Sequence, residues 1–265
     1  MTAPEDRSEE PAADIELPRG FTAHVANVGI KDATDDFVVI STEVPCAAAA
    51  VFTRSRFAGP SVELSRRHVA DGSLRAVVVV SKNANVATGE AGRADAEELA
   101  AGVAGAIGAD PSDVLVASTG VIGRRYPMDR VRSHLARLAT PFPITSALPV
   151  ATAMMTTDTH PKVAARTVPT RSDAVGGPAR VVGVAKGVGM IEPDMATMLA
   201  FVFTDAEVAP DVLDAAFRRV VDRTFNSLSV DTDTSTSDTA AVLASGAAGA
   251  VDADTLEQVL GEVCL

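Results

Sequence analysis

The chain has 265 residues, of which 47% are hydrophobic and only 4% aromatic, and its formal net charge is −12. A chain of this length can bury a substantial core in one large or two small domains. Its negative field repels phosphate backbones and anionic membrane surfaces, which argues against nucleic-acid and membrane partners. Apolar runs stay well short of the about 18 residues that a membrane-spanning helix needs. The two cysteines, Cys46 and Cys264, have no metal-ligand spacing, so we assign no metal.

The N-terminal segment, residues 1–18, is acidic and rich in proline and alanine, and it has no apolar signal core. These features predict a disordered tail ahead of a fold that begins near Arg19. They also predict a cytoplasmic protein.

Short β-branched and apolar runs predict buried strands, at residues 37–40, 77–80, 114–116, 181–184 and 198–203. Apolar stripes at helical spacing predict helices, at residues 95–107, 131–138, 211–225 and 252–263. Prolines and glycines between residues 167 and 180 indicate an exposed loop or hairpin. This succession predicts an α/β (α+β) fold, a layered sandwich of mixed sheets and helices.

Residues 231–238 alternate acidic and hydroxyl side chains, as a calcium-binding loop does. Thr236 and Val242 occupy the positions at which such a loop requires glycine and glutamate, so the pattern fails. We interpret the stretch as a cap before a helical segment at residues 240–243.

Thr197 stands just before the apolar run of residues 198–203 and after a glycine-containing loop. A hydroxyl at the start of a strand can attack the preceding carbonyl, that of Ala196, and cleave its own chain. The product is a threonine whose free α-amine serves as its own general base. Without further signals, the plainer interpretation is a threonine that begins a buried strand.

Residues 186–199 resemble a segment of the self-processing ornithine acetyltransferase / glutamate N-acetyltransferase (ArgJ-type) family of arginine biosynthesis. Its members carry Lys-Gly-x-Gly-Met, a short proline-containing spacer and Ala-Thr-Met-Leu. Further matches follow in order: Val51-Phe52-Thr53-Arg54, Asn83-Ala84-Asn85-Val86-Ala87-Thr88-Gly89, Ala117-Ser118-Thr119-Gly120-Val121-Ile122-Gly123, Met155-Thr156-Thr157-Asp158-Thr159 and Asp233-Thr234-Ser235-Thr236-Ser237-Asp238-Thr239. Several collinear motifs are far more specific than any one of them. The chain departs at Thr232, where many members have glycine.

The resemblance implies that Thr197 is the nucleophile and that the chain cleaves itself between Ala196 and Thr197. Thr119 and Gly120 would form the oxyanion hole. An acetyl group would pass from N-acetylornithine to glutamate through an ester on Thr197. No cofactor is implied, and acetyl-CoA would be a co-substrate only if the chain also carries out the glutamate N-acetyltransferase step.

The resemblance also implies that Thr156 and Lys186 contact substrate together with Thr197. Residues 19–196 would form the alpha chain and residues 197–265 the start of a beta chain, in a heterotetramer of two alpha and two beta chains. Family members are longer, so the resemblance implies that the C-terminal third is missing here.

Each of these residues also has a plainer interpretation. Lys186 could be a solvated loop lysine, Thr156 a cap, and Thr119-Gly120 a turn that ends a strand. Asn83 and Asn85 are best interpreted as turn residues. Two other functions are compatible with the motifs: a self-processing aminopeptidase or amidohydrolase of related fold, in which water accepts the acyl group, and an inert, truncated remnant.

Overall fold

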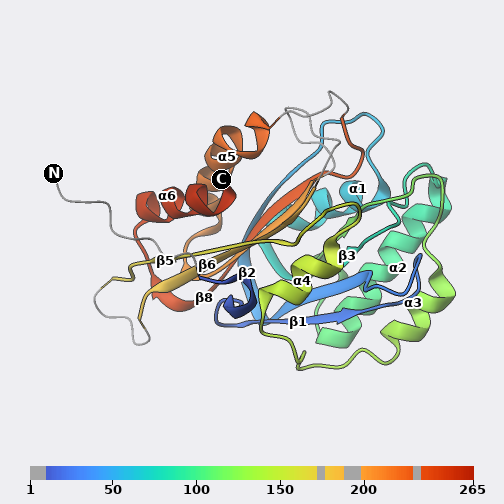
Figure 1. The fold of residues 1–265 in the computed structure, drawn as a ribbon, viewed down its shortest axis with the longest axis horizontal. Helices are drawn as coiled ribbons and strands as arrows, with labels where there is room; N and C mark the ends of the chain where they lie inside the picture. The colour runs from blue at the N-terminus through green and yellow to red at the C-terminus, as the bar shows by residue number, and fades with distance from the viewer. Residues whose placement is uncertain (1–9, 172–176, 188–197, 229–233) are drawn as a thin grey trace.

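The computed structural model of the chain describes residues 10–171, 177–187, 198–228 and 234–265. Its strands are Phe21–Ala26 (β1), Phe37–Phe52 (β2), Ser73–Val80 (β3), Val114–Ser118 (β4), Lys162–Val168 (β5), Ala179–Lys186 (β6), Leu199–Glu207 (β7) and Thr239–Ala250 (β8). They form one 8-stranded sheet in the order β4-β3-β2-β8-β7-β6-β5, with β1 paired to β2 beside that path (Figure 1). The sheet is mixed, because β3–β4 and β7–β8 pair in parallel while the other neighbours are antiparallel.

Helices cover both faces of this sheet. They are Pro60–His68 (α1), Gly89–Ile107 (α2), Met128–Leu135 (α3), Ala147–Met154 (α4), Pro210–Arg223 (α5) and Ala253–Cys264 (α6). Short 3-10 turns lie at Ala12–Asp14, Val69–Asp71, Pro111–Asp113 and Phe225–Ser227. One face packs against α4 and β1. The opposite face carries two apolar clusters, one under α2 and α3 and the other under α5 and α6. Helices α5 and α6 lie side by side (Figure 1). The layered α/β fold is thus confirmed.

The local sequence explains where several helices begin and end. Proline occupies the first turn of α1 and of α5, where its missing N–H costs nothing. The Asp252 carboxylate caps α6 by accepting a hydrogen bond from the Thr255 N–H at 2.9 Å. Gly108 ends α2 in the left-handed conformation, at φ 65°.

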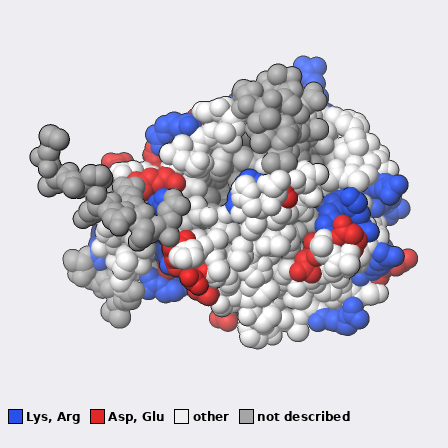
Figure 2. All heavy atoms as spheres, in the orientation of Figure 1, with Lys and Arg blue, Asp and Glu red and all other residues white. Residues whose placement is uncertain are grey.

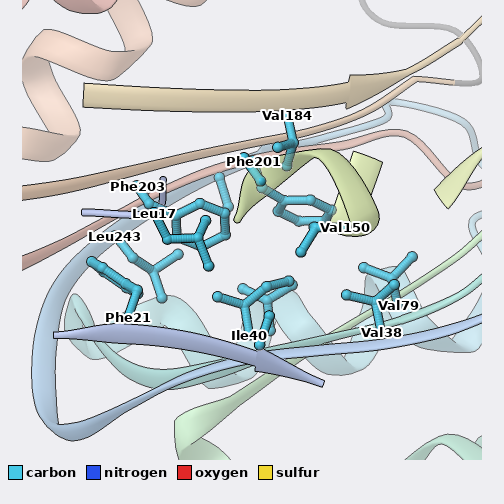
Figure 3. Close-up of a cluster of buried hydrophobic side chains, with 14 of the residues drawn as sticks. Leu17, Phe21, Val38, Ile40, Val79, Val150, Val184, Phe201, Phe203 and Leu243 are labelled. Atoms are coloured by element: carbon cyan, nitrogen blue, oxygen red, sulfur yellow. The ribbon is translucent and has the colours of Figure 1, made fainter. Parts of the chain in front are cut away.

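The face toward α4 holds large apolar side chains, among them Phe201, Phe203 and Leu243 (Figure 3). Leu17 points into the same cluster, and Ile15 is also buried in it. The Leu17 N–H donates to the Thr145 carbonyl at 2.6 Å. The expectation of a disordered tail over residues 1–18 is therefore wrong for residues 10–18, because their alternating apolar side chains join the core ahead of Arg19.

Four of the five predicted strands lie within observed ones, and the fifth, residues 198–203, is observed as β7 from Leu199 onward. The predicted loop or hairpin at residues 167–180 falls between β5 and β6, which pair antiparallel, although residues 172–176 lie outside the described residues. The predicted helices are observed as α2, α3, α5 and α6, although α2 begins earlier and α3 ends before Leu138. The helical segment expected at residues 240–243 is wrong, since those residues belong to β8. β8 lies between β2 and β7, and hydrogen bonds from both neighbours outweigh the intrinsic helix preference of its alanines.

Charge is balanced locally over much of the surface. On the face in Figure 2, basic and acidic side chains lie next to one another around a broad uncharged region. Pairs such as Arg132–Glu98 and Arg219–Glu257 contribute to this balance. Exposed pairs of this kind are worth about 0–1 kcal/mol, so they do little to hold the fold. Within the described ranges, no helix is long and apolar enough to cross a membrane.

Candidate active site

Two residues singled out from the sequence, Thr119 and Lys186, meet at the ends of separate strands. β4 ends one residue before Thr119, and β6 ends at Lys186. The Lys186 Nζ lies 3.4 Å from the Thr119 Oγ1, and this contact is buried. Lys186 is only 2% exposed, so the interpretation as a solvated loop lysine is wrong.

Gly120 continues from Thr119 into a tight turn against the end of β3. Its φ is 127°, and a Cβ there would lie 2.3 Å from the carbonyl carbon of Lys82. Only glycine fits such an approach. The Val121 N–H donates to the Lys82 carbonyl at 3.2 Å, which holds the turn in place.

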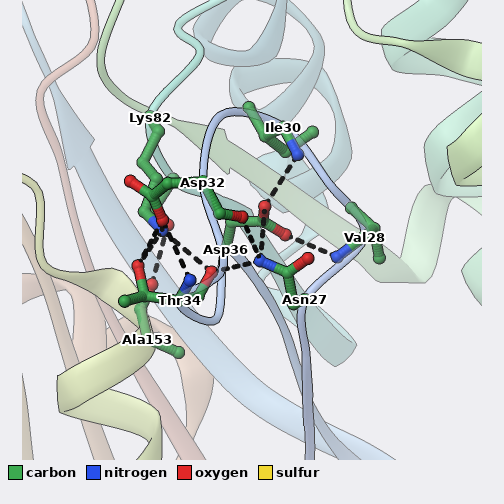
Figure 4. A network of polar contacts seen from close by, with 9 residues as sticks. Asn27, Val28, Ile30, Asp32, Thr34, Asp36, Lys82 and Ala153 are labelled. Carbon is green, nitrogen blue, oxygen red and sulfur yellow. Dashed lines mark hydrogen bonds and ion pairs between the residues drawn. The ribbon is translucent and has the colours of Figure 1, made fainter.

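A polar network fixes Lys82 in turn (Figure 4). Lys82 has a positive φ of 71°. Its ammonium donates to Asp32 Oδ1 at 2.8 Å and to the Thr34 carbonyl at 2.9 Å. The buried Asp36 carboxylate accepts the Val28 N–H at 2.7 Å and closes the same loop. The loop at residues 27–36 therefore supports the turn on which Gly120 rests.

Thr156 lies close in the chain to a carboxylate that connects it to Lys186. The Asp158 Oδ2 accepts the Thr156 N–H at 3.2 Å, and its Oδ1 accepts the Gly187 N–H at 2.8 Å. Lys162 Nζ also donates to Oδ1, at 2.7 Å. Asp158 thus ties the loop that carries Thr156 to the backbone directly after Lys186, a link that the sequence analysis missed.

Asp238 is a second residue that the sequence analysis missed. Its side chain is fully buried just before β8, and its Oδ1 accepts the Met198 N–H at 2.8 Å. Met198 directly follows Thr197 in the chain. Ala196 and Thr197 themselves lie outside the described residues, so their predicted roles remain predictions.

The site combines buried groups of opposite charge. Burial lowers the pKa of Lys186, while Asp158 and Asp238 favour its charged form. Burial raises the pKa of Asp238 to about 7, although the Met198 N–H, the Ser235 hydroxyl and the charge of Lys186 all act to lower that pKa. Burial also acts to raise the pKa of Asp158, but hydrogen bonds from Lys162, Gly187 and Thr156 outweigh it and hold that pKa below its ordinary value.

A largely apolar pocket of about 470 Å³ adjoins these groups and is lined by Lys186, Gly187, Met198 and Phe201, among others. A larger hollow of about 900 Å³ lies between β2 and α5, lined by neither Thr119 nor Lys186. In the part of the chain that the structure describes, no group of three or more His, Cys, Asp or Glu side chains could hold a metal ion. Asn83 and Asn85 serve the turn after β3: the Asn85 N–H donates to Asn83 Oδ1 at 2.8 Å.

Solved structures share this fold. The ornithine acetyltransferase of Mycobacterium tuberculosis, complexed with ornithine, superposes with a TM-score of 0.61 at 33% identity, covering 72% of this chain and 98% of that one. The arginine biosynthesis bifunctional protein ArgJ of Bacillus halodurans gives a TM-score of 0.62 at 34% identity, covering 68% and 92%. A beta-aminopeptidase of Burkholderia sp. has a similar fold, with a TM-score of 0.51, but only 16% identity over 95% of this chain and 88% of that one.

The family model described as the ArgJ family matches residues 22–265, and the chain belongs to that family. A glutamate N-acetyltransferase of Streptomyces clavuligerus is 53% identical over 249 residues, 94% of this chain and 61% of the relative. The arginine biosynthesis bifunctional protein ArgJ of Rhodococcoides fascians is 51% identical over 258 residues, 97% of this chain and 62% of the relative. The chain thus spans less than two thirds of the length of these relatives.

Proposed function

We propose that the chain is the larger part of a self-cleaving acetyltransferase that passes an acetyl group from N-acetylornithine to glutamate, with Thr197 as its nucleophile. Membership of the ArgJ family and the names of the relatives support this proposal. The observation that carries it is the position of the buried Lys186 ammonium, 3.4 Å from the Thr119 hydroxyl. Lys186 also lines the same pocket as Met198, the residue that follows the proposed nucleophile.

Self-cleavage would come first. The Thr197 hydroxyl attacks the Ala196 carbonyl carbon, the C–N bond breaks, and water hydrolyses the resulting ester. The Thr119 hydroxyl and the Gly120 N–H are the groups we assign to the developing oxyanion, because the Gly120 turn leaves its backbone exposed. The new N-terminus of Thr197 is an α-amine, which has an ordinary pKa of about 7.7–8.0.

Acetyl transfer would then use that amine as general base. The amine takes the hydroxyl proton as the Thr197 oxygen attacks the acetyl carbonyl, and the proton passes to the departing amine of ornithine. The amine of glutamate attacks the acetyl ester in the second half-reaction. Lys186 and Thr156 would bind the substrate carboxylate. No cofactor is required, and acetyl-CoA would replace N-acetylornithine as donor in a glutamate N-acetyltransferase step.

The proposed assembly is a heterotetramer of two alpha and two beta chains, made from residues before and after the cleaved bond. Size-exclusion chromatography with light scattering would measure its mass. A mass equal to a single uncut chain would contradict the assembly.

Mass spectrometry of the purified protein tests the cleavage. We expect fragments that meet between Ala196 and Thr197, and an uncut Thr197→Ala variant. Release of ornithine from N-acetylornithine, measured with and without glutamate, tests the transfer. A rate that does not respond to glutamate would favour an amidohydrolase, and an intact, inactive wild-type chain would contradict the proposal as a whole.

A further inference from the structure

Asp158 is held between the two segments that carry Thr156 and Lys186. It lies in the loop between α4 and β5, and its side chain is only 1% exposed. From its own loop, the Thr156 N–H donates to its Oδ2 at 3.2 Å. From the end of β6, the Gly187 N–H donates to its Oδ1 at 2.8 Å. The carboxylate thus fixes the main chain directly after Lys186 against a separate loop.

Pairing with Lys162 does not by itself explain why this carboxylate is buried. The Lys162 Nζ donates to Oδ1 at 2.7 Å, but the lysine side chain is 34% exposed. An ion pair open to solvent adds little stability, whereas taking a carboxylate out of water is costly. The burial of Asp158 therefore serves the contact with the end of β6 more than the pair with Lys162.

Lys186, the last residue of β6, is a cation that is itself only 2% exposed. A buried ammonium loses its proton easily unless an opposite charge lies near it. Burial lowers the pKa of Lys186, and the charge of Asp158 opposes this effect more strongly than that of Asp238 does. The charge of Lys162 acts the other way and lowers that pKa further. Asp158 is therefore the main counter-charge of this lysine.

We propose that Asp158 is a positioning residue that acts through Lys186: it fixes the backbone after this lysine and supplies the opposite charge that the buried ammonium needs to bind the substrate carboxylate. This inference rests on the proposed function, because it takes Lys186 as a ligand of that carboxylate. The role of Asp158 ends at substrate binding, with no part in proton transfer or bond cleavage. Its removal should therefore weaken substrate binding and leave the chemical step almost unchanged.

The Asp158→Asn variant removes the charge and keeps a side chain of the same size. We expect it to cleave itself, with KM for N-acetylornithine at least about tenfold higher and kcat within about twofold of wild type. The alkaline limb of the kcat/KM profile should move to lower pH by about one unit or more, because a neighbouring opposite charge shifts a pKa by about 1–3 units. The direction follows from Lys186, which binds a carboxylate while protonated and loses its proton at lower pH without Asp158.

Combining Asp158→Asn with Lys186→Met separates this route from a structural one. If Asp158 acts through the lysine charge, the double variant should have a kcat/KM within about twofold of Lys186→Met alone. A loss that multiplies fully with that of Lys186→Met would overturn the inference. An unchanged KM in Asp158→Asn would overturn it as well. Both results would leave Lys186 in place as a substrate ligand.

Asp205 provides a matched control. It is also buried, it pairs with a basic side chain, that of Arg19, and it accepts a backbone N–H, that of Arg180. Asp205→Asn should lose stability in urea denaturation and keep the wild-type KM and pH profile. A rise in KM as large as that of Asp158→Asn would show that the loss of any buried carboxylate is enough, and it would overturn the inference.

Lys162→Met decides the question if Asp158→Asn fails to fold or to cleave itself. This variant keeps both backbone contacts of Asp158 and removes a like charge that acts on Lys186. We therefore expect the alkaline limb to move to higher pH and KM not to rise. A limb that moves to lower pH, or a KM about tenfold higher, would show that the site needs the ion pair with Lys162, and would overturn the inference. An uncut wild-type protein, or one that releases no ornithine from N-acetylornithine, would instead contradict the proposed function.

Discussion

The ammonium of Lys186 lies 3.4 Å from the hydroxyl of Thr119, although 67 positions separate the two residues in the chain. Both are buried, and each stands where a strand of the sheet ends. A lysine with so little exposure needs compensating charge. Asp158 and Asp238 supply it from two loops, so the four side chains form one electrostatic unit.

Replacing Lys186 by methionine should keep its length and remove its charge. We expect kcat/KM for N-acetylornithine to fall at least about tenfold, because a hydrogen bond to a charged group contributes about 1.5–3 kcal/mol. Steady-state kinetics on the folded variant would measure this effect. The exposed Lys31 offers a control, and Lys31→Met should behave as wild type. Equal kinetics for both variants would rule out Lys186 as a substrate ligand.

The Gly120→Ala substitution should destabilise the fold, because its Cβ would lie 2.3 Å from the Lys82 backbone at a φ of 127°. We expect a loss of at least about 1–3 kcal/mol in the free energy of unfolding. Gly105 in α2 is a matched control, since a Cβ there meets nothing within 4 Å. Gly105→Ala should stabilise by about 0.5–1 kcal/mol. Urea denaturation would compare the two, and a neutral Gly120→Ala would show that the turn is not tightly packed.

Lys82 has a positive φ of 71°, so we expect glycine at this position to be more stable than alanine, although glycine has no side chain. Lys82→Ala and Lys82→Gly both remove the contacts to Asp32 and Thr34. Glycine adopts a positive φ without steric cost, so Lys82→Gly should be more stable than Lys82→Ala by about 1 kcal/mol. Thermal denaturation of the pair would show it. An alanine variant that is the more stable of the two would mean that the loop relaxes after substitution.

His24 and His134 should make stability depend on pH. Their Nε2 atoms lie 2.9 Å apart, so the ring that accepts the hydrogen bond must be neutral. Burial lowers the pKa of both, and for His134 the nearby His24 and Arg137 lower it further. The unfolded chain therefore binds protons first, and this stabilisation is present above about pH 6.5 and lost as the pH falls through the lower folded values.

Urea denaturation at pH 7.5 and pH 5.5 would measure that loss. The wild-type protein should lose more stability between the two conditions than His134→Gln, whose side chain stays uncharged in both. An identical loss in the two proteins would show that the pair does not titrate with folding.

The strands were predictable where β-branched residues run together, as in Val77–Val80, because few other environments suit such a run. β8 was not, since its residues are mostly alanine and glycine and its hydrogen-bond partners come from β2 and β7. Ile15 and Leu17 were missed for a related reason. Their neighbours are polar, and only the packed core shows that two apolar side chains are enough to hold the segment.

The site was predictable in its residue types and less so in its connections. The motifs pointed to Thr119 and Lys186, but their contact is set by the tertiary fold, because the strands that lead to them, β4 and β6, are not neighbours in the sheet. Asp158 and Asp238 were visible only as members of hydroxyl-rich stretches. A carboxylate in such a stretch most often caps a turn, and the sequence does not show that Asp238 reaches Met198, which lies 40 positions earlier.

The order of strands has a last consequence for a chain severed just ahead of β7. β7 and β8 would then belong to the downstream piece. β8 is hydrogen-bonded to β2, and β7 to β6, and both β2 and β6 belong to the upstream piece. The two strands of the downstream piece would lie in the middle of the sheet, between β2 and β6 of the upstream piece. Separating the two pieces would require breaking the hydrogen bonds of both strand pairs, β2–β8 and β6–β7, at the same time. The two pieces of a cut chain should therefore stay associated in solution.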